Sequence, residues 1–212
     1  MTVAARMTTV VLFVLSIGWL HAEDSGWMSL FDGKTLDGWQ ASDAPGTFSV
    51  KDGAIVVHGP RSHLYYMGPI ENHDFTNFEW KADVMTTPGS NSGMYFHTVF
   101  EPTGWPSKGY EVQVNNSHTD PKRTGGLYGI QDVFEAPARD NEWFTQQIVV
   151  RGKVVIVSVN GKTLVTYTEP DNVSRPADMS GRKLSHGTFA LQGHDPKSLV
   201  YYKNIMVKVL PR

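Results

Sequence analysis

The sequence contains no cysteine among its 212 residues. Disulfide bonds, thiolate metal sites and a lipid-modified cysteine behind a signal peptide are therefore excluded. Any chemistry that the chain performs must come from carboxylates, imidazoles, amides, hydroxyls and cationic side chains.

Long hydrophobic runs are also scarce. The longest covers residues 7–20, which is too short for a comfortable membrane span of about 20 apolar residues. Arg6 precedes this run and the small residue Ala22 follows it, so residues 1–22 are expected to be a secretory signal and residues 23–212 a single domain. A leucine near the cleavage site fits poorly and leaves an uncleaved anchor as the alternative. An exported chain without cysteine is therefore expected to be secreted by a bacterium or to reside in a bacterial periplasm.

The chain also has no large excess of positive or negative charge. The formal net charge is −2, with 19 Lys and Arg against 21 Asp and Glu. Such a balance provides no electrostatic attraction to nucleic acid or to an anionic membrane. Neither is expected as a partner of the mature domain.

The sequence shows no helical stripe with a period of 3.6 residues. Short strand patterns recur instead from end to end, separated by turn signals of which Asn160-Gly161 is the strongest. Many antiparallel strands without helices predict an all-β chain in which two sheets pack face to face, or a jelly roll. Two longer loops, at residues 101–108 and 117–126, are where binding groups are expected.

The stretch GYEVQVNN, residues 109–116, has a polar row that the fold alone does not require. Its apolar residues alternate with Glu111, Gln113 and Asn115, which places a carboxylate and two amides on one face of the strand. This row is either a solvent-exposed face or an array that binds hydroxyl groups.

The same alternation predicts which residues join this row. His97, Gln192 and His194 fall on the outward faces of their strands, opposite apolar residues such as Met94 and Leu191. If these strands are neighbours, their outward side chains form one patch with Glu111 and Gln113. The large aromatic residues expected in the core are Phe31, Trp39, Trp80, Trp143 and Phe189.

Several longer motifs carry a resemblance: LFDGKTLDGWQ, NSGMYFH, GYEVQVNNSHTDPKRTGGLYG, the VNG hairpin and GTFALQGHDPKSLVYYKNIMVK. Together they resemble the 3-keto-disaccharide hydrolase family, over nearly all of the mature chain. The resemblance implies a concanavalin A-like jelly-roll β-sandwich, exported by bacteria, that acts on sugars oxidised to a ketone at carbon 3. Many members carry Arg where this chain has His97, a departure that indicates a subfamily.

The polar row fits the chemistry that this resemblance implies. Ordinary glycoside hydrolysis requires two carboxyl groups, whereas the row offers only Glu111. A ketone at carbon 3 acidifies the hydrogen on carbon 2, so loss of that proton releases the substituent on carbon 1 and water then adds to the product. This route requires a general base, a group that stabilises the enediolate oxygen and a proton donor.

The residues assigned to these roles follow from the patterning together with the resemblance. We expect His97 or His194 to be the base or a metal ligand, and Glu111 to be a metal ligand or an acid. A divalent metal ion, held by Glu111 and His97, is one expected stabiliser of the enediolate. Gln113 and Gln192 are expected to bind sugar hydroxyls.

The loops supply the remaining candidates. Trp105 is expected either to stack on a sugar ring or to pack its loop against the sandwich. Asn91 is expected either to bind a sugar hydroxyl or to shape the turn in which it lies. Arg123 is either a clamp for a ketone oxygen or a solvated loop charge. His118 and Asp120 are an alternative pair of ligands for a cation.

Two other functions remain open from the sequence. A carbohydrate-binding module without activity needs the amides and Trp105 but no base, and the fold alone supports it. An ordinary glycosidase needs Glu79, Asp83 and Glu111 to converge.

Overall fold

The computed structural model describes Met1 and residues 26–211. The signal expected at residues 1–22 lies outside the residues described, apart from Met1. In the described part the chain forms thirteen strands and three short 3₁₀ helices, and no helix there is long and apolar enough to cross a membrane.

The strands follow one another along the chain with short turns or longer loops between them. They are β1 (Trp27–Ser29), β2 (Trp39–Ala41), β3 (Phe48–Lys51), β4 (Ala54–Val57), β5 (Ser62–Tyr66), β6 (Phe78–Thr86), β7 (Ser92–Thr98), β8 (Tyr110–Val114), β9 (Phe144–Arg151), β10 (Val154–Val159), β11 (Lys162–Thr168), β12 (Thr188–Gly193) and β13 (Val200–Val209). The 3₁₀ helices are η1 (Pro45–Thr47), η2 (Ile70–His73) and η3 (Ala177–Met179).

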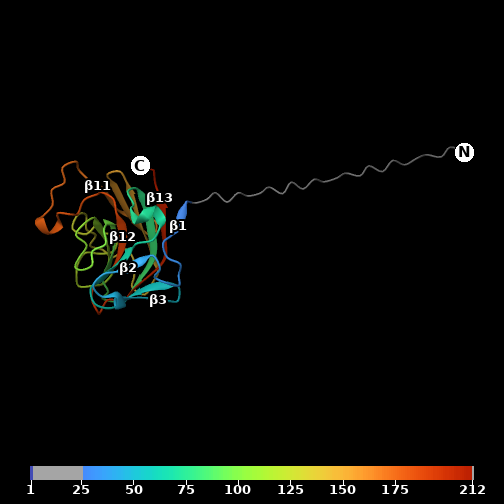
Figure 1. The fold of residues 1–212 in the computed structure, drawn as a ribbon, viewed down its shortest axis with the longest axis horizontal. Helices are drawn as coiled ribbons and strands as arrows, with labels where there is room; N and C mark the ends of the chain where they lie inside the picture. Colours follow the sequence, from blue (N-terminus) through green and yellow to red (C-terminus); the bar gives the residue numbers. More distant parts are fainter. Residues whose placement is uncertain (2–25, 212) are drawn as a thin grey trace.

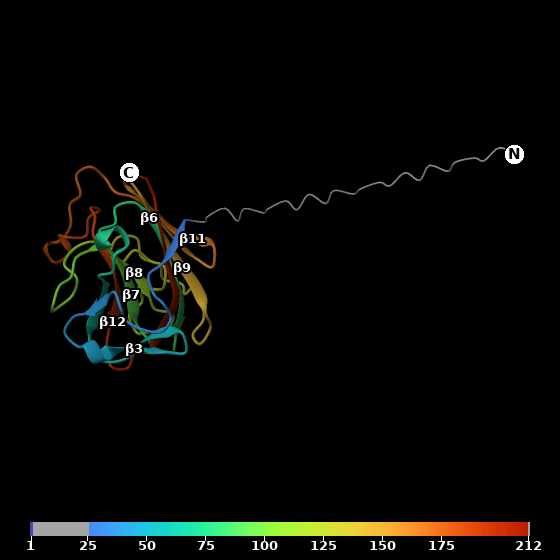
Figure 2. The same ribbon diagram turned by 45° about the vertical axis from the view of Figure 1, so that its right-hand side comes forward.

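The strands form two antiparallel sheets packed as a sandwich (Figures 1 and 2). One sheet has eight strands in the order β11-β10-β9-β6-β13-β4-β3, with β1 also paired to β13. The other has five strands in the order β2-β5-β12-β7-β8. The predicted fold class, an all-β jelly-roll sandwich of two antiparallel sheets, is confirmed.

The core between the sheets comes from the period-two alternation of the sequence. Trp80 of β6 stacks on Phe189 of β12 with ring centroids 4.4 Å apart, so these two rings join the two sheets. The predicted core positions of Phe31, Trp39, Trp80 and Phe189 are confirmed, but Trp143 is 39% exposed. Trp143 precedes β9, outside any alternating strand, and Lys203 Nζ lies 4.0 Å over its ring.

The Asn160-Gly161 turn joins β10 to β11 in the eight-stranded sheet, as its sequence predicts. Both residues have positive φ, 49° and 77°, which is the backbone that this type of hairpin requires. The polar row of GYEVQVNN lies on the other sheet, in β8.

One long segment between β11 and β12 has no strand of its own. It comprises residues 170–187, contains η3, and is called the strap here. The orange part of the ribbon in Figure 1 shows it standing out on the left of the sandwich. The N–H of Gly109, directly before β8, donates to the carbonyl of Gly181, so the strap passes the end of β8.

Candidate active site

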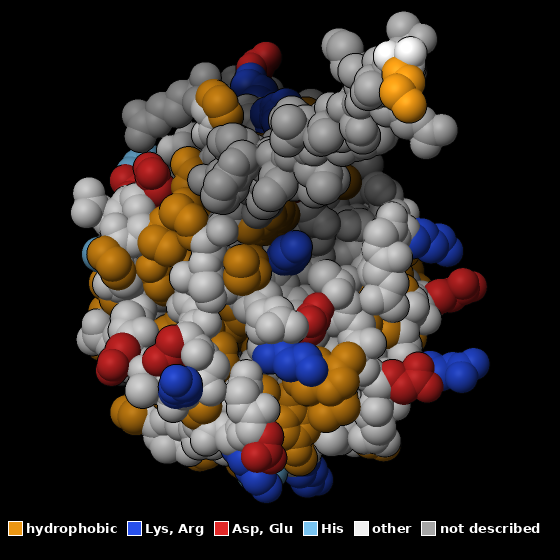
Figure 3. Space-filling view, turned by 90° about the vertical axis from the view of Figure 1, so that its right-hand side faces the viewer, with side chains coloured by type: hydrophobic (Ala, Val, Ile, Leu, Met, Phe, Trp, Pro, Cys, Tyr) orange, Lys and Arg blue, Asp and Glu red, His pale blue; other side chains and the backbone are white. Residues whose placement is uncertain are grey.

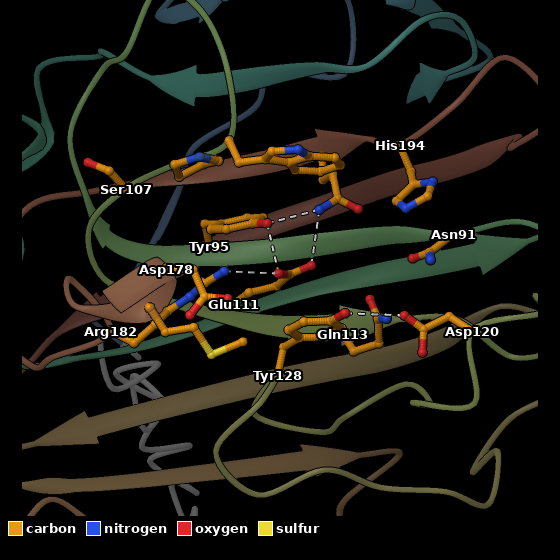
Figure 4. A pocket seen from close by; sticks show the side chains of 14 residues that line it. Asn91, Tyr95, Ser107, Glu111, Gln113, Asp120, Tyr128, Asp178, Arg182 and His194 are labelled. Atoms are coloured by element: carbon orange, nitrogen blue, oxygen red, sulfur yellow. Dashed lines mark hydrogen bonds and ion pairs between the residues drawn. The ribbon is translucent and has the colours of Figure 1, made fainter. Parts of the chain in front are cut away.

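A pocket of about 390 Å³ lies over the outer face of the five-stranded sheet (Figure 4). Its floor comes from the strands and their ends, and its walls come from the strap and two loops. The lining residues are Asn91, Tyr95, Trp105, Pro106, Ser107, Glu111, Gln113, Asp120, Tyr128, Asp178, Met179, Arg182, Gln192 and His194.

The floor of the pocket is the polar row of β8 with its neighbours on β7 and β12. Glu111 and Gln113 line it together with Gln192, while Val112 and Val114 lie in the core between the sheets. The face assigned to these residues from the sequence is therefore confirmed. Gly93 of β7 makes room for the carboxylate, because a Cβ there would lie 2.6 Å from Glu111 Oε1.

Glu111 is the centre of a hydrogen-bond network. Tyr95 donates its hydroxyl to Oε2 at 2.8 Å, and Gln192 Nε2 donates to Oε1 at 3.0 Å. Arg182 Nη2 lies 3.4 Å from Oε2 and forms an ion pair with it. Figure 4 shows these side chains converging on the carboxylate from different elements.

The electrostatic state of Glu111 follows from its burial. The residue is 5% exposed, and loss of solvent raises the pKa of its carboxyl although Arg182, Tyr95 and Gln192 all oppose the shift. Glu111 therefore takes up a proton more readily than a surface glutamate does. A buried carboxyl group with a raised pKa is suited to act as a proton donor.

His194 lies at the other end of the pocket, on the opposite side of Glu111 from Arg182 in the view of Figure 4. Its Nδ1 is 2.8 Å from Asp195 Oδ2. Although partial burial opposes it, hydrogen bonds from His194 and Ser198 hold the pKa of Asp195 at about 2, so Asp195 accepts and His194 Nδ1 carries the proton. The free lone pair is then on Nε2, which is the arrangement of a general base oriented by a carboxylate.

His97 does not lie in the pocket. Its φ is 55°, and the pairing of β7 with β12 changes register at this point, so the alternation that continues through Tyr95 is broken there. The ring Nε2 donates to Thr76 O at 2.9 Å, and Nδ1 accepts from Ser185 N at 3.2 Å. Burial lowers the pKa of His97 to about 4, so the ring is neutral. The prediction that His97 shares a face with Glu111 is wrong.

Some of the other predicted site residues line the pocket and others do not. Asn91 and Trp105 line the pocket, and Trp105 is 45% exposed with its ring 5.7 Å from that of His194. Arg123 does not line it, because its Nη1 donates to the carbonyl of His118 and to Asn115 Oδ1 within its own loop. Asn91, Trp105, Gln113 and Gln192 remain predicted ligands of substrate hydroxyls or rings.

Among the described residues, His118, His194 and Asp195 form the one group of metal-ligating side chains close enough to hold an ion. Neither Glu111 nor His97 belongs to it. His118 Nδ1 accepts the backbone N–H of Asp120 at 3.1 Å and lies 3.4 Å from Asn91 Nδ2, so Nε2 carries the proton. Both oxygens of Asp195 already accept hydrogen bonds. The group can hold a metal ion only after these bonds are exchanged, so its donors fit an ion poorly.

Four residues in or beside the pocket escape the sequence analysis. Tyr95 falls on the expected face and Asp195 directly follows His194, so alternation and adjacency are the signals that point to them. Tyr128 lies in the GGLYG motif, where no alternation of polar and apolar residues indicates which way its side chain points. Arg182 is in the strap, where no periodicity exists, and nothing in the sequence singles it out.

Comparison with known proteins extends this description. The sequence profile of a family described as the 3-keto-alpha-glucoside-1,2-lyase-like domain matches residues 26–208. A 3-keto-disaccharide hydrolase of Bacteroides thetaiotaomicron is 24% identical to this chain, in an alignment that covers 90% of this chain and 81% of the relative.

Solved structures share the fold at low sequence identity. A putative glycosyl hydrolase from Parabacteroides distasonis has a TM-score of 0.72 at 23% identity, over 88% of this chain and 94% of its own. The carbohydrate-binding module CBM66 from Bacillus subtilis has a TM-score of 0.57 at 12% identity, over 81% of this chain and 95% of its own. A β-glucanase of Bacillus licheniformis has a TM-score of 0.53 at 10% identity, covering 82% of this chain and 92% of its own.

Proposed function

The chain belongs to the 3-keto-alpha-glucoside-1,2-lyase-like domain family, and from this premise we propose that it cleaves 3-keto-glycosides by elimination followed by hydration. The substrates are 3-keto-disaccharides or related glycosides, and the net result is hydrolysis of the glycosidic bond. Because residues 1–22 read as a secretory signal, the reaction takes place in the periplasm or outside the cell.

The observation that carries the proposal is the content of the pocket floor. It holds one buried carboxyl group, Glu111, and one imidazole with a free ring nitrogen, that of His194. Glu79 and Asp83 do not converge with Glu111, as an ordinary glycosidase would require, because both lie on β6 in the other sheet. Asp120 and Asp178 also line the pocket, but Asp120 accepts from Lys122 N and Tyr128, and Asp178 is exposed.

The first step is removal of the hydrogen on carbon 2 by His194 Nε2. The electrons of that C–H bond form a double bond between carbons 2 and 3, and the ketone oxygen takes up the negative charge. Asp195 stabilises the resulting imidazolium through its hydrogen bond to Nδ1. Proton transfer by a positioned group of this kind accelerates a reaction by about 10²–10⁴-fold.

The second step breaks the bond between carbon 1 and the leaving oxygen. The ketone re-forms, the electrons of the carbon 2–carbon 3 double bond move between carbons 1 and 2, and the leaving oxygen accepts a proton from Glu111. Water then adds to carbon 1 and a proton returns to carbon 2. Protons balance over the cycle, and no oxidant or reductant is consumed.

Incubation in deuterated water tests this function. Purified mature domain is mixed with 3-keto-trehalose or 3-keto-lactose, with and without a chelator, and the products are followed by NMR. We expect cleavage with solvent deuterium on carbon 2, and no cleavage of the unoxidised sugars. Product without deuterium at carbon 2, after subtraction of background enolisation, would contradict the elimination.

A carbohydrate-binding module is the second candidate. It is favoured by the exposed ring of Trp105 beside the amides of Gln113 and Gln192, a combination suited to a sugar ring and its hydroxyls. Binding of the 3-keto sugar in titration calorimetry without any turnover would establish this function in place of catalysis.

A further inference from the structure

We propose that the guanidinium of Arg182, and not a metal ion, is the positive charge that stabilises the enediolate oxygen on carbon 3. The inference rests on the proposed function. It assigns a further catalytic residue, and it makes Arg182 the group that distinguishes a keto sugar from its unoxidised parent.

Arg182 is the one Lys or Arg among the described residues that lines the pocket. Its Cζ lies 5.3 Å from the centroid of the Tyr95 ring, and its Nη2 lies 3.4 Å from Glu111 Oε2. Only 12% of its side chain is exposed. A charge held in a site of this kind, with little water around it, interacts more strongly with a developing oxyanion than a surface charge does.

The guanidinium also has an unused donor. Nη1 is buried and has no hydrogen-bond partner in the described part of the chain. An unpaired buried donor costs about 1–3 kcal/mol, or more when it is charged, so its presence requires an explanation. The enediolate oxygen of a bound substrate is the partner that would satisfy it.

A second arginine of the strap, Arg175, contacts the backbone of Arg182. Arg175 Nε donates to the carbonyl oxygen of Arg182 at 2.9 Å, and Arg175 Nη2 donates to the hydroxyl groups of Tyr110 and Tyr167 at 2.9 and 2.6 Å. One arginine therefore fixes the position of the other and anchors the strap to β8 and β11. Positioning of this kind lowers the reorganisation that the reaction requires.

Neighbouring residues add further anchors. The N–H of Leu184 donates to the carboxylate of Glu169 at 2.9 Å, and that of Ser185 donates to His97 Nδ1 at 3.2 Å. Gly181 packs on the 101–108 loop so closely that a Cβ would lie 1.9 Å from Ser107 O. His97 is thus an anchor of the segment that carries Arg182.

The donors around Glu111 do not suit a metal ion. Its two oxygens accept from Tyr95 and Gln192, and the nearby guanidinium repels a second cation. The His118, His194 and Asp195 group would require the lone pair of His194, which the proposed base needs free. The positive charge for the enediolate is therefore available from Arg182 without rearrangement of the pocket.

The test separates deprotonation from cleavage. The probe is the 3-keto form of 1,5-anhydroglucitol, which has no exocyclic substituent on carbon 1 that could leave, and the measurement is exchange of the hydrogen on carbon 2 with deuterated water by NMR. The variants are Arg182→Ala and Arg182→Lys. Arg151→Met, which removes an exposed charge at the end of β9, is the control.

We expect Arg182→Ala to lower the exchange rate and the cleavage of 3-keto-trehalose by about 10²–10³-fold, as loss of an oxyanion donor does. Free guanidinium ion in the assay should restore part of the rate of Arg182→Ala and should not raise the rate of wild type. A purely structural role of Arg182 would not produce this rescue. Arg182→Lys should retain more activity than Arg182→Ala. Arg151→Met should match wild type.

Two results would overturn the inference while leaving the function intact. One is exchange in Arg182→Ala within about threefold of wild type at an unchanged melting temperature. The other is loss of wild-type activity with a chelator that a divalent ion restores. Wild type that catalyses neither exchange nor cleavage would instead overturn the proposed function.

Discussion

The outer faces of the two sheets are built from the same alternating pattern but have opposite environments. In β6 and β9 of the eight-stranded sheet, residues alternate between buried and half-buried. In β7, β8 and β12 of the five-stranded sheet, every residue is buried. The strap and the loops after β7 and β8 cover the second face, and this cover, rather than the strands, produces the difference.

Polar residues on the two faces differ accordingly. Asp83 accepts from Thr145 at 2.6 Å and from Asn204 at 2.7 Å on the eight-stranded sheet, and Glu79 accepts from Gln147 at 3.1 Å. Figure 3 shows charges of both signs interspersed on the face it presents. Burial of Glu111 instead raises the pKa of its carboxyl and prepares it for proton transfer. The two faces therefore differ because loops and the strap bury the polar row of β8, and not because the strand patterns differ.

The largest effect is expected where the covered carboxyl group is altered. Glu111→Gln should lower cleavage of 3-keto-trehalose by about 10³-fold or more, because the amide cannot act as an acid toward the leaving oxygen. The amide keeps the shape of the carboxyl group but loses its ion pair with Arg182, so the melting temperature of this variant measures what that pair contributes to stability. Glu79→Gln, the matched change on the other sheet, should leave the rate unchanged. Equal losses in both variants would remove the contrast between the faces.

The next effect concerns His63, which is fully buried on the covered face beneath the ring of Trp105, 5.4 Å away. Burial lowers its pKa from 6.5 to about 3. Its contribution to stability is therefore fully present above pH 6.5 and is lost as the pH falls toward 3. His63→Phe should raise the free energy of unfolding by roughly 3 kcal/mol at about pH 4 and change it little above neutrality.

Urea titrations of His63→Phe and wild type at the two pH values measure this difference. His186 forms an exposed ion pair with Asp74, and His186→Gln is the control. A constant difference between His63→Phe and wild type across the pH range would show that His63 is not kept neutral, and hence that the Trp105 loop does not cover it in solution.

A third effect tests the base. His194→Ala should lower cleavage and carbon 2 exchange together by about 10²-fold, because both begin with removal of the same proton. Asp195→Asn should have a smaller effect in the same direction, since it disturbs only the orientation of the ring. Loss of cleavage with full retention of exchange in His194→Ala would reassign His194 to the leaving-group step.

The smallest effect is expected in the hairpin of the solvated sheet. Gly161 has a φ of 77°, so Gly161→Val should destabilise the fold by roughly 1–2 kcal/mol through backbone strain. The catalytic rate of the folded fraction should stay at the wild-type value, as measured by activity corrected for folded fraction. A large rate loss at unchanged melting temperature would link this hairpin to the pocket.

The sequence predicts the floor of the site but not its walls. Period-two alternation places Glu111, Gln113 and Gln192 correctly, because a strand with one apolar face has only one way to lie on the core. The same rule fails at His97, where an extra residue enters β7 and a non-glycine residue takes a positive φ. Such bulges depend on contacts with Thr76 and Ser185, which are distant in sequence and leave no local signal.

The strap escapes prediction for a related reason. Its position depends on single hydrogen bonds, in which Glu169 and His97 accept from strap backbone N–H groups and Arg175 donates to Tyr110 and Tyr167. No repeat of hydrophobic residues marks such a segment. For Trp143 the prediction of a core position is wrong. A large aromatic residue next to a strand suggests burial, but only a residue within the alternation of the strand is assigned to a face, and Trp143 lies outside it.

The anchors of the strap have a consequence for its dynamics. The amide hydrogens of Leu184 and Ser185 bond to side chains of Glu169 and His97 rather than to a neighbouring strand. They can therefore exchange with solvent deuterium through local opening, without separation of the sheets. In a hydrogen-exchange experiment the strap should behave as a unit of low local stability beside slowly exchanging strands. A ligand that binds Arg182 should slow exchange in the strap first, so amide protection there reports occupancy of the pocket even in variants that cannot turn over.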